Sequence, residues 1–291
     1  MKSLLPLTGC FLGLSLSSVH AQSQEDFELR NGRRIAAESV KPTATGFSAV
    51  VVTGANAQNI TFTAKDIVRA NLREPAALAE ARTLIASGKL IAAISLLTTT
   101  EEELLPYRQV PGAWWHRALM LRMDALAAKG EAAAALAAAG AEELAGLPEE
   151  SAASLTGFQD IIAKPIGSPE TKIASLEAVA KRTADPWIAA RAWLEVGNTH
   201  AGQGKMEAAV KTWLRVAVFH PAERDLAVRG TILAARGLQQ IERPQDGLKL
   251  LDDYLNDHLA SPYETTIKAE AAKIDPKRDT TPAAPADKDP K

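Results

Sequence analysis

The sequence predicts a mainly α-helical protein in which a small β unit precedes a long array of helical hairpins. Three observations support this fold class. Apolar residues alternate with a period of two from Phe27 to Leu72, as they do in strands, and take helical spacing from Pro75 to about Lys273. Within the helical part, a small residue followed by a proline recurs along the chain. The small residues are Ala93, Ala135, Ala174, Ala209 and Gly247, and the prolines are Pro106, Pro148, Pro186, Pro221 and Pro262.

Residues 1–21 have the pattern of a secretory signal peptide. Lys2 supplies the positive start, an apolar stretch runs from Leu4 to Leu16, and Val19 and Ala21 fit the small-residue cleavage pattern. We therefore expect cleavage after Ala21 and export to the periplasm or cell envelope of a bacterium. The stretch ending at Cys10 also resembles a bacterial lipobox, which leaves lipidation of Cys10 open as an alternative. Cleavage after Ala21 would remove the only cysteine of the chain.

Composition and charge fit a soluble globular protein. The chain is 46% apolar and 23% charged. Its 33 basic and 35 acidic residues give a net charge of −2, and removal of Lys2 with the leader leaves 32 basic against 35 acidic residues, or −3. This balance favours neither nucleic acid nor a membrane surface as a partner. No segment after the leader approaches the ~18 consecutive apolar residues of a membrane span.

Residues 22–73 are expected to form a small β domain. Asn31-Gly32 is a strong signal for a two-residue hairpin turn, because both turn positions require positive φ. Further strands are expected at 47–53 and 59–63, and 66–68 would close the set. So few short strands fit a small SH3-like sheet or barrel that leans on the helices after it.

Residues 74–272 are expected to form helical hairpins, and residues 273–291 a disordered tail rich in proline and charge. Each expected hairpin has a glycine- or proline-containing turn between its helices, and a proline ends its second helix. The expected helix pairs are 76–86 with 90–98, 114–128 with 131–144, 149–164 with 169–183, the pair within 190–223, and 222–238 with 246–259.

The segment 190–223 resembles one copy of the tetratricopeptide (TPR) repeat, whose period is ~34 residues. It carries large and small residues at the spacing of that family. The repeat-defining residues are Trp193, Gly197, His200, Ala209, Trp213 and Pro221. The resemblance implies an α-solenoid whose repeats bind partners and rarely catalyse reactions. The other hairpins match the pattern weakly, and spacings longer than ~34 residues place regular superhelical geometry in doubt.

The resemblance also implies a concave groove lined by the first helix of each pair. Laying the family register on this chain directs a set of mostly basic residues toward that groove. The candidate partner-binding residues are Arg82, Arg117, Asp124, Arg191, Asn198, Arg229 and Arg236. Guanidinium groups suit bidentate recognition of carboxylates, so acidic or C-terminal peptide segments are the expected ligands, with solvated surface arginines as the alternative. Leu194 stands where peptide-clamping members of the family use a lysine, so the full clamp is not present.

No motif in the sequence points to catalysis, a cofactor or a metal site. The five histidines are scattered without metal-ligand spacing, and no G-x-S-x-G, P-loop or dinucleotide fingerprint occurs. One ring of Trp114-Trp115 is expected in the core, and the other could be an exposed anchor. We therefore expect a non-catalytic adaptor or scaffold for an unidentified protein or peptide. The alternatives are a lipid-anchored envelope-assembly factor and a self-associating structural protein.

Overall fold

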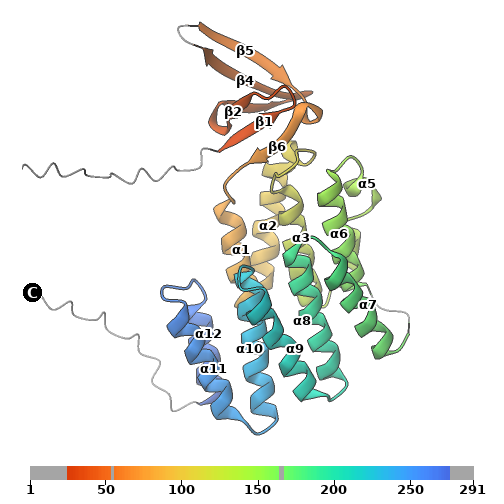
Figure 1. Ribbon diagram of the computed structural model, residues 1–291, viewed down its shortest axis with the longest axis vertical. Helices are drawn as coiled ribbons and strands as arrows, with labels where there is room; N and C mark the ends of the chain where they lie inside the picture. The colour runs from red at the N-terminus through yellow and green to blue at the C-terminus, as the bar shows by residue number, and fades with distance from the viewer. Residues whose placement is uncertain (1–24, 54–55, 164–166, 276–291) are drawn as a thin grey trace, which may run out of the picture.

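A computed structural model describes residues 25–53, 56–163 and 167–275 of the 291-residue chain. Within these ranges the protein is mainly helical, with a small antiparallel β region at its N-terminal end (Figure 1). The predicted class of a mainly α protein with a β unit before the helices is therefore confirmed. In the same ranges, no helix is both long and apolar enough to cross a bilayer. The expected signal peptide, Cys10 and most of the expected tail lie outside the described residues.

The β region consists of two three-stranded antiparallel sheets. Their strand orders are β2-β1-β6 and β3-β4-β5. The strands are β1 (Asp26–Leu29), β2 (Arg34–Ala36), β3 (Val40–Thr43), β4 (Gly46–Thr53), β5 (Asn56–Phe62) and β6 (Ile67–Asn71). β1 and β2 are joined by a hairpin at Asn31-Gly32, but its turn has three residues, Arg30 to Gly32, and of these Gly32 alone has positive φ, at 80°. β3 was not predicted, because Lys-Pro within it breaks the pattern of a strand.

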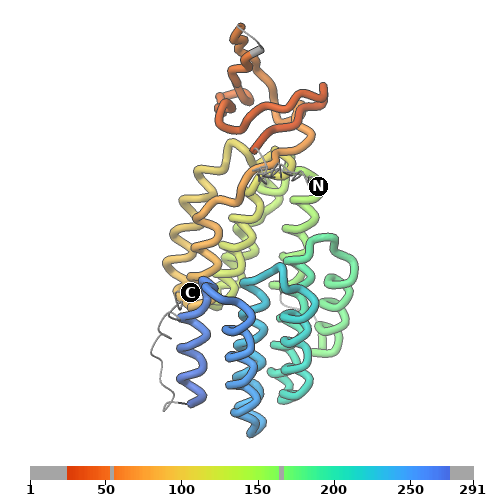
Figure 2. Tube along the Cα trace, turned by 60° about the vertical axis from the view of Figure 1, so that its left-hand side comes forward, coloured from red at the N-terminus to blue at the C-terminus, as the bar shows by residue number. Residues whose placement is uncertain are grey.

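The core of the β region includes residues from the helical part of the chain. The rings of Phe27, Phe47 and Tyr107 stack on one another with centroids 5.5–6.3 Å apart. Val110 and Ala113, which follow Tyr107 between two helices, are buried in the same cluster. The peptide N–H of Ala70 on β6 also donates to the carbonyl of Pro111 at 2.7 Å. These contacts fix the β region against the start of the helical part (Figure 2).

The helical part is a series of antiparallel helix pairs followed by one more helix. The first helices of the pairs are α1 (Ala76–Ala86), α3 (Trp115–Ala128), α6 (Glu149–Ile162), α8 (Pro186–Gly202) and α10 (Arg224–Gln240). The second helices are α2 (Leu90–Leu104), α4 (Ala132–Ala137) with α5 (Ala141–Leu144), α7 (Pro169–Arg182), α9 (Met206–Phe219) and α11 (Pro244–Asp257). The last helix is α12 (Glu264–Ile274).

Three of these elements differ from the sequence expectation. The second helix of the second pair is divided near Gly140, where the expected helix 131–144 becomes α4 and α5. Helix α2 continues to Leu104, beyond the expected end at 98. α12 was not predicted as a separate helix and reaches Ile274 inside the expected tail, because Tyr263, Ile267 and Ala271 bury its apolar face against α10 and α11.

The first helices of the pairs form a closed ring. α1 contacts α3, α3 contacts α6, α6 contacts α8, α8 contacts α10, and α10 contacts α1. One apolar core runs through this ring from Leu78 on α1 to Leu238 on α10. Since successive first helices are separated by one antiparallel helix, they all run in the same direction. Their N-termini therefore all point to the end nearer the β region, although α8 and α10 begin farther from it than α1 does (Figure 1). We call this end the mouth of the ring.

Candidate functional site

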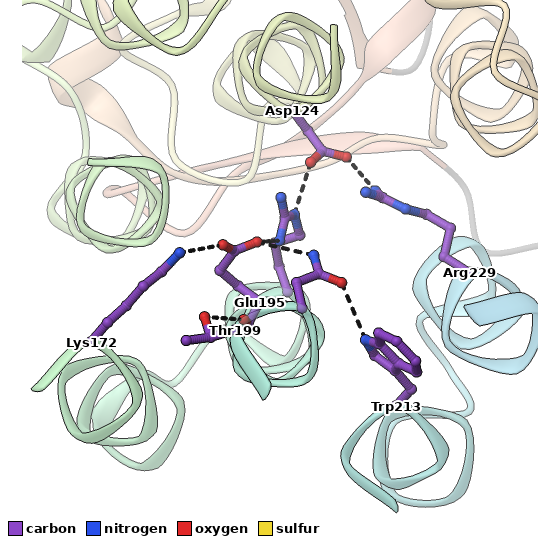
Figure 3. Close-up of polar contacts among 8 residues, drawn as sticks. Asp124, Lys172, Glu195, Thr199, Trp213 and Arg229 are labelled. Atoms are coloured by element: carbon purple, nitrogen blue, oxygen red, sulfur yellow. Dashed lines mark hydrogen bonds and ion pairs between the residues drawn. The ribbon is translucent and has the colours of Figure 1, made fainter. Parts of the chain in front are cut away.

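The interior of the ring holds a buried carboxylate between two arginines. Asp124 projects from α3 and is only 1% exposed. Its Oδ1 accepts a hydrogen bond from Nε of Arg191 on α8 at 2.8 Å, and its Oδ2 accepts one from Nη1 of Arg229 on α10 at 2.5 Å (Figure 3). Side chains from three of the first helices thus meet at a single carboxylate. We call Asp124, Arg191 and Arg229 the central cluster.

The two guanidinium groups keep the central carboxylate ionised. Burial by itself would raise the pKa of Asp124, but the charges of Arg229 and Arg191 outweigh burial and hold that pKa below its usual value. Attraction between buried charges is largely offset by the free-energy cost of removing them from water. The cluster therefore fixes how α3, α8 and α10 pack against one another more than it adds to the stability of the fold. Loss of one member would leave an uncompensated charge inside the ring.

A polar network extends from the central cluster toward the outer helices. Nη1 of Arg191 lies 3.5 Å from Glu195 on the next turn of α8, and Nζ of Lys172 on α7 donates to Glu195 at 2.6 Å. Asn198 donates to Glu195 at 3.1 Å and accepts from the indole N–H of Trp213 on α9 at 3.2 Å (Figure 3). The network links α3, α7, α8, α9 and α10, and Asn198 occupies its solvent-exposed end.

Arginines and carboxylates also pair at the mouth of the ring. Nη2 of Arg117 on α3 lies 3.2 Å from Asp185, whose other contacts include a hydrogen bond from Ser154 Oγ at 2.9 Å. Arg82 on α1 forms an ion pair with Glu74 and lies 4.0 Å from Asp225 on α10. Both guanidinium groups are therefore held by carboxylates of the chain itself.

These carboxylates lie at the N-terminal ends of helices, where the positive end of the helix dipole favours negative charge. Asp185 is the N-cap of α8 and accepts hydrogen bonds from the backbone N–H groups of Trp187 and Ile188. Asp225 lies in the first turn of α10, and Glu74 comes just before α1. The acids at these three helix starts pair with Arg82 and Arg117.

Two hollows open at the mouth. One of about 760 Å³ lies between β6, α3, α6 and the start of α8. The other, of about 670 Å³, lies between α1, the start of α10 and the segment before α12. Trp114 and Arg117 line both hollows. The indole N–H of Trp114 donates to the carbonyl of Leu72 at 3.0 Å, which fixes its half-buried ring beneath the β region. The mouth is thus a two-lobed surface, and its larger lobe borders the β region.

Only some of the candidate partner-binding residues lie close together in the structure. Asp124, Arg191 and Arg229 meet in the central cluster, and Arg82 and Arg117 lie at the mouth. Arg236 is half-exposed and pairs with Glu270 of α12 at 2.7 Å, away from both places. Each of the five expected arginines contacts a carboxylate of the chain. The sequence reasoning found the arginines and Asp124 but missed the other acids, although the positions of Glu74, Asp185 and Asp225 at helix starts could have identified three of them.

The repeat-defining residues lie around the contact between α8 and α9. A Cβ atom added at Gly197 would lie 2.4 Å from the ring of Trp213, and Ala209 is fully buried. Trp193 is half-buried, with the guanidinium carbon of Arg215 4.3 Å from its ring centroid. His200 is half-buried, and its Nδ1 has no hydrogen-bond partner among the described residues. Pro221 is exposed after the end of α9.

One histidine near the mouth has a neutral ring at physiological pH. Burial, together with the charge of Arg117, lowers the pKa of His116 to about 4. Its Nδ1 lies 3.2 Å from the hydroxyl oxygen of Ser151 on α6. No sequence pattern indicates this pair, because its residues come from different helices. Across the described ranges, histidine, cysteine and acidic side chains form no group of three or more that could hold a metal ion.

Comparisons of this chain with protein-family models, with curated proteins and with solved structures gave no match. Its function is therefore inferred from the arrangement of its own residues. That arrangement is a closed helical ring around an internal ion cluster, with a two-lobed hollow surface beside the β region.

Proposed function

We propose that this protein is a non-catalytic protein–protein interaction adaptor of the bacterial periplasm or cell envelope. A peptide or helix of its partner binds at the mouth of the ring. The observation that carries the proposal is the pair of adjoining hollows that share Trp114 and Arg117. Tryptophan and arginine are the side chains that most often anchor protein interfaces, and clefts between domains are common binding sites.

The electrostatics favour the mouth over the interior of the ring as the binding surface. Arg191 is 6% exposed and forms ion pairs with Asp124 and Glu195. A ligand in solution therefore has little access to it. Arg117, in contrast, lines both hollows, so a partner side chain can approach it without unfolding any helix pair. The proposal therefore moves the binding site from the expected groove to the end of the ring.

We further infer that the helix pairs are of the tetratricopeptide type and that the ring is an α-solenoid whose first and last pairs meet. The close approach of Gly197 to Trp213 and the buried Ala209 support this inference, because both are small residues where paired helices contact. The small β region is accordingly interpreted as an SH3-like unit that covers the mouth.

Site-specific photo-crosslinking in the native cells tests the proposal. A photoreactive amino acid is placed at Arg69, which lines the larger hollow, or at Glu80, which lines the smaller one. The control position is Ile91, which is 74% exposed at the start of α2, far from the mouth. The proposal predicts the same protein adduct from both mouth positions and none from the control. Absence of adducts at the mouth, or equal adducts at all positions, contradicts it.

Mass spectrometry of the purified N-terminus tests the expected localisation. The adaptor proposal predicts a free N-terminus at Gln22, as cleavage after Ala21 would leave. A lipid-modified Cys10 would instead support the alternative of a lipid-anchored envelope-assembly factor.

A further inference from the structure

The two β sheets have four edges, and three of them are protected against pairing with another chain. β2 has only three residues and carries Arg34, and β3 carries Lys41 and Pro42. β6 is covered, because the N–H of Ala70 donates to the carbonyl of Pro111 at 2.7 Å. Short length, charge, proline and a covering segment are the usual means by which proteins block strand edges.

The fourth edge, β5, lacks these protections. β5 has seven residues without proline or charge, and within the described ranges it pairs only with β4. The β4–β5 hairpin projects away from the helices (Figure 1), and residues 56–59 and Thr61 of β5 are exposed. Beside it, Val50 and Val52 of β4 are 50% and 68% exposed. A long, neutral and accessible edge of this kind is a template for another strand.

The register of the hairpin identifies which residues face the open edge. Thr53 pairs with Asn56, so the connection has two residues, and the closing pair of such a hairpin is hydrogen-bonded. Hydrogen-bonded and non-hydrogen-bonded pairs alternate along an antiparallel ladder. The backbone N–H and C=O groups of Ala57, Asn59 and Thr61 therefore point away from β4, toward the open edge.

We propose that β5 pairs antiparallel with β5 of a second copy of this chain, about a two-fold axis at Asn59. In this register Asn59 lies opposite Asn59 of the second copy, and Ala57 lies opposite Thr61. Every outward-facing backbone group then has a partner, and the two Asn59 side chains lie side by side, where their amides can hydrogen-bond. The inference rests on the β5 edge alone and is independent of the proposed adaptor function.

The lack of charge on β5 favours a second copy of this chain as its partner, and the length of the strand limits the strength of the dimer. Since β5 carries no charge, two copies approach without the like-charge contact that Lys41 would create if β3 paired with itself. The exposed Val50 and Val52 of each copy would flank the joined strands on one face of a continuous sheet. Pairing of two seven-residue strands covers less than the ~1,200 Å² typical of stable complexes, so the dimer should be weak and concentration-dependent.

Disulfide trapping in the full chain tests the proposed register. Asn59→Cys is introduced into a Cys10→Ser background and oxidised. Directly opposed hydrogen-bonded residues have Cα atoms about 5.5 Å apart, within the range of a disulfide. The matched control is Gln58→Cys, since the two copies of residue 58 would be diagonal neighbours roughly 7–8 Å apart, too far to bridge. We expect a disulfide-linked dimer from Asn59→Cys at several-fold higher yield than from Gln58→Cys.

Light scattering over a range of concentrations provides the second measurement. The chain should show a rising dimer fraction, which Asn59→Pro abolishes by removing one outward N–H without touching the bonds to β4. If Asn59→Pro disturbs the β region, Asn59→Lys tests the same edge by adding charge. A monomer at all concentrations, or equal crosslinking at positions 58 and 59, overturns the proposal. A monomer whose β5 edge binds a strand of another protein overturns the assignment to a second copy.

Discussion

Asp124 on α3 and Arg229 on α10, which are 105 residues apart in sequence, are joined by a hydrogen bond of 2.5 Å across the inside of the helical ring. This bond connects the second helix pair to the fifth. Together with the contact between α1 and α10, it makes the helical part a closed unit in which the first and last pairs depend on one another. This closure can be tested through the free energy of unfolding, its dependence on pH and the distance between α1 and α10.

Replacing Asp124 by asparagine should strongly destabilise the fold. The substitution keeps the size of the side chain but leaves Arg191 and Arg229 without their carboxylate inside the ring. Breaking a buried ion pair by removing one partner typically costs about 3–5 kcal/mol. Urea denaturation of Asp124→Asn against the wild type measures this difference in the free energy of unfolding.

The matched control for this prediction is an exposed ion pair. Asp246 pairs with Arg243 at 2.6 Å, and both side chains are about half-exposed or more. Surface pairs of this kind contribute little, because water and salt screen them. Asp246→Asn should therefore leave stability nearly unchanged, and an equal loss in both variants would contradict the role of the central cluster.

Two glycines of the same helix should respond in opposite ways to alanine. A Cβ at Gly197 would lie 2.4 Å from Cδ1 and Nε1 of Trp213, so Gly197→Ala forces α8 and α9 apart and should cost about 1–3 kcal/mol. Gly202, at the end of α8, has no such neighbour within 4 Å. Gly202→Ala should be neutral or slightly stabilising, because alanine is the better helix former. Thermal unfolding of the two variants measures the contrast.

Much of the fold could be predicted from the sequence because its signals are local. The Asn31-Gly32 turn, the change of apolar period at Pro75 and the repeated prolines each act within a few residues. α12 was missed as a separate helix because its burial depends on α10 and α11, which no local pattern reveals. The closure of the ring was missed for the same reason, since α1 and α10 are brought together only by the accumulated rotation of the pairs between them.

The candidate site was predictable only in part. The register of the tetratricopeptide repeat, which one segment resembles, selected Arg82, Arg117 and the members of the central cluster as candidate partner-binding residues. It could not show that carboxylates of the chain would pair with them, because Asp124 meets Arg191 and Arg229 across long sequence separations. The acids Glu74, Asp185 and Asp225 near the expected helix starts were visible in the sequence. Their convergence at the mouth requires the common direction of the first helices, which is a property of the assembled ring.

The stability of the protein should fall as the pH drops from about 6.5 toward 4, in part because of His116. Burial lowers the pKa of this histidine to about 4 in the folded protein, below the value of about 6.5 in the unfolded chain. Between these values the unfolded chain binds a proton that the folded protein does not, so the free energy of unfolding falls as the pH falls. A gap of this size corresponds to roughly 3 kcal/mol.

Urea denaturation at a series of pH values checks the contribution of His116. His116→Asn keeps a polar atom near Ser151 but removes the titrating ring, so its stability should depend less on pH in this interval than that of the wild type. His258→Asn, on the exposed end of α11, is the control. If His116→Asn and the wild type show parallel pH profiles, the buried neutral histidine is not the cause.

Closure of the ring by α1 and α10 forms the mouth and encloses the central cluster. The distance between spin labels at Glu80→Cys on α1 and Arg224→Cys on α10, in a Cys10→Ser background, tests it most directly. Both residues line the same hollow at the mouth. Pulsed electron spin resonance should give one narrow distribution at short distance. A long or broad distribution, as in an open array whose first and fifth helix pairs are apart, would contradict the account.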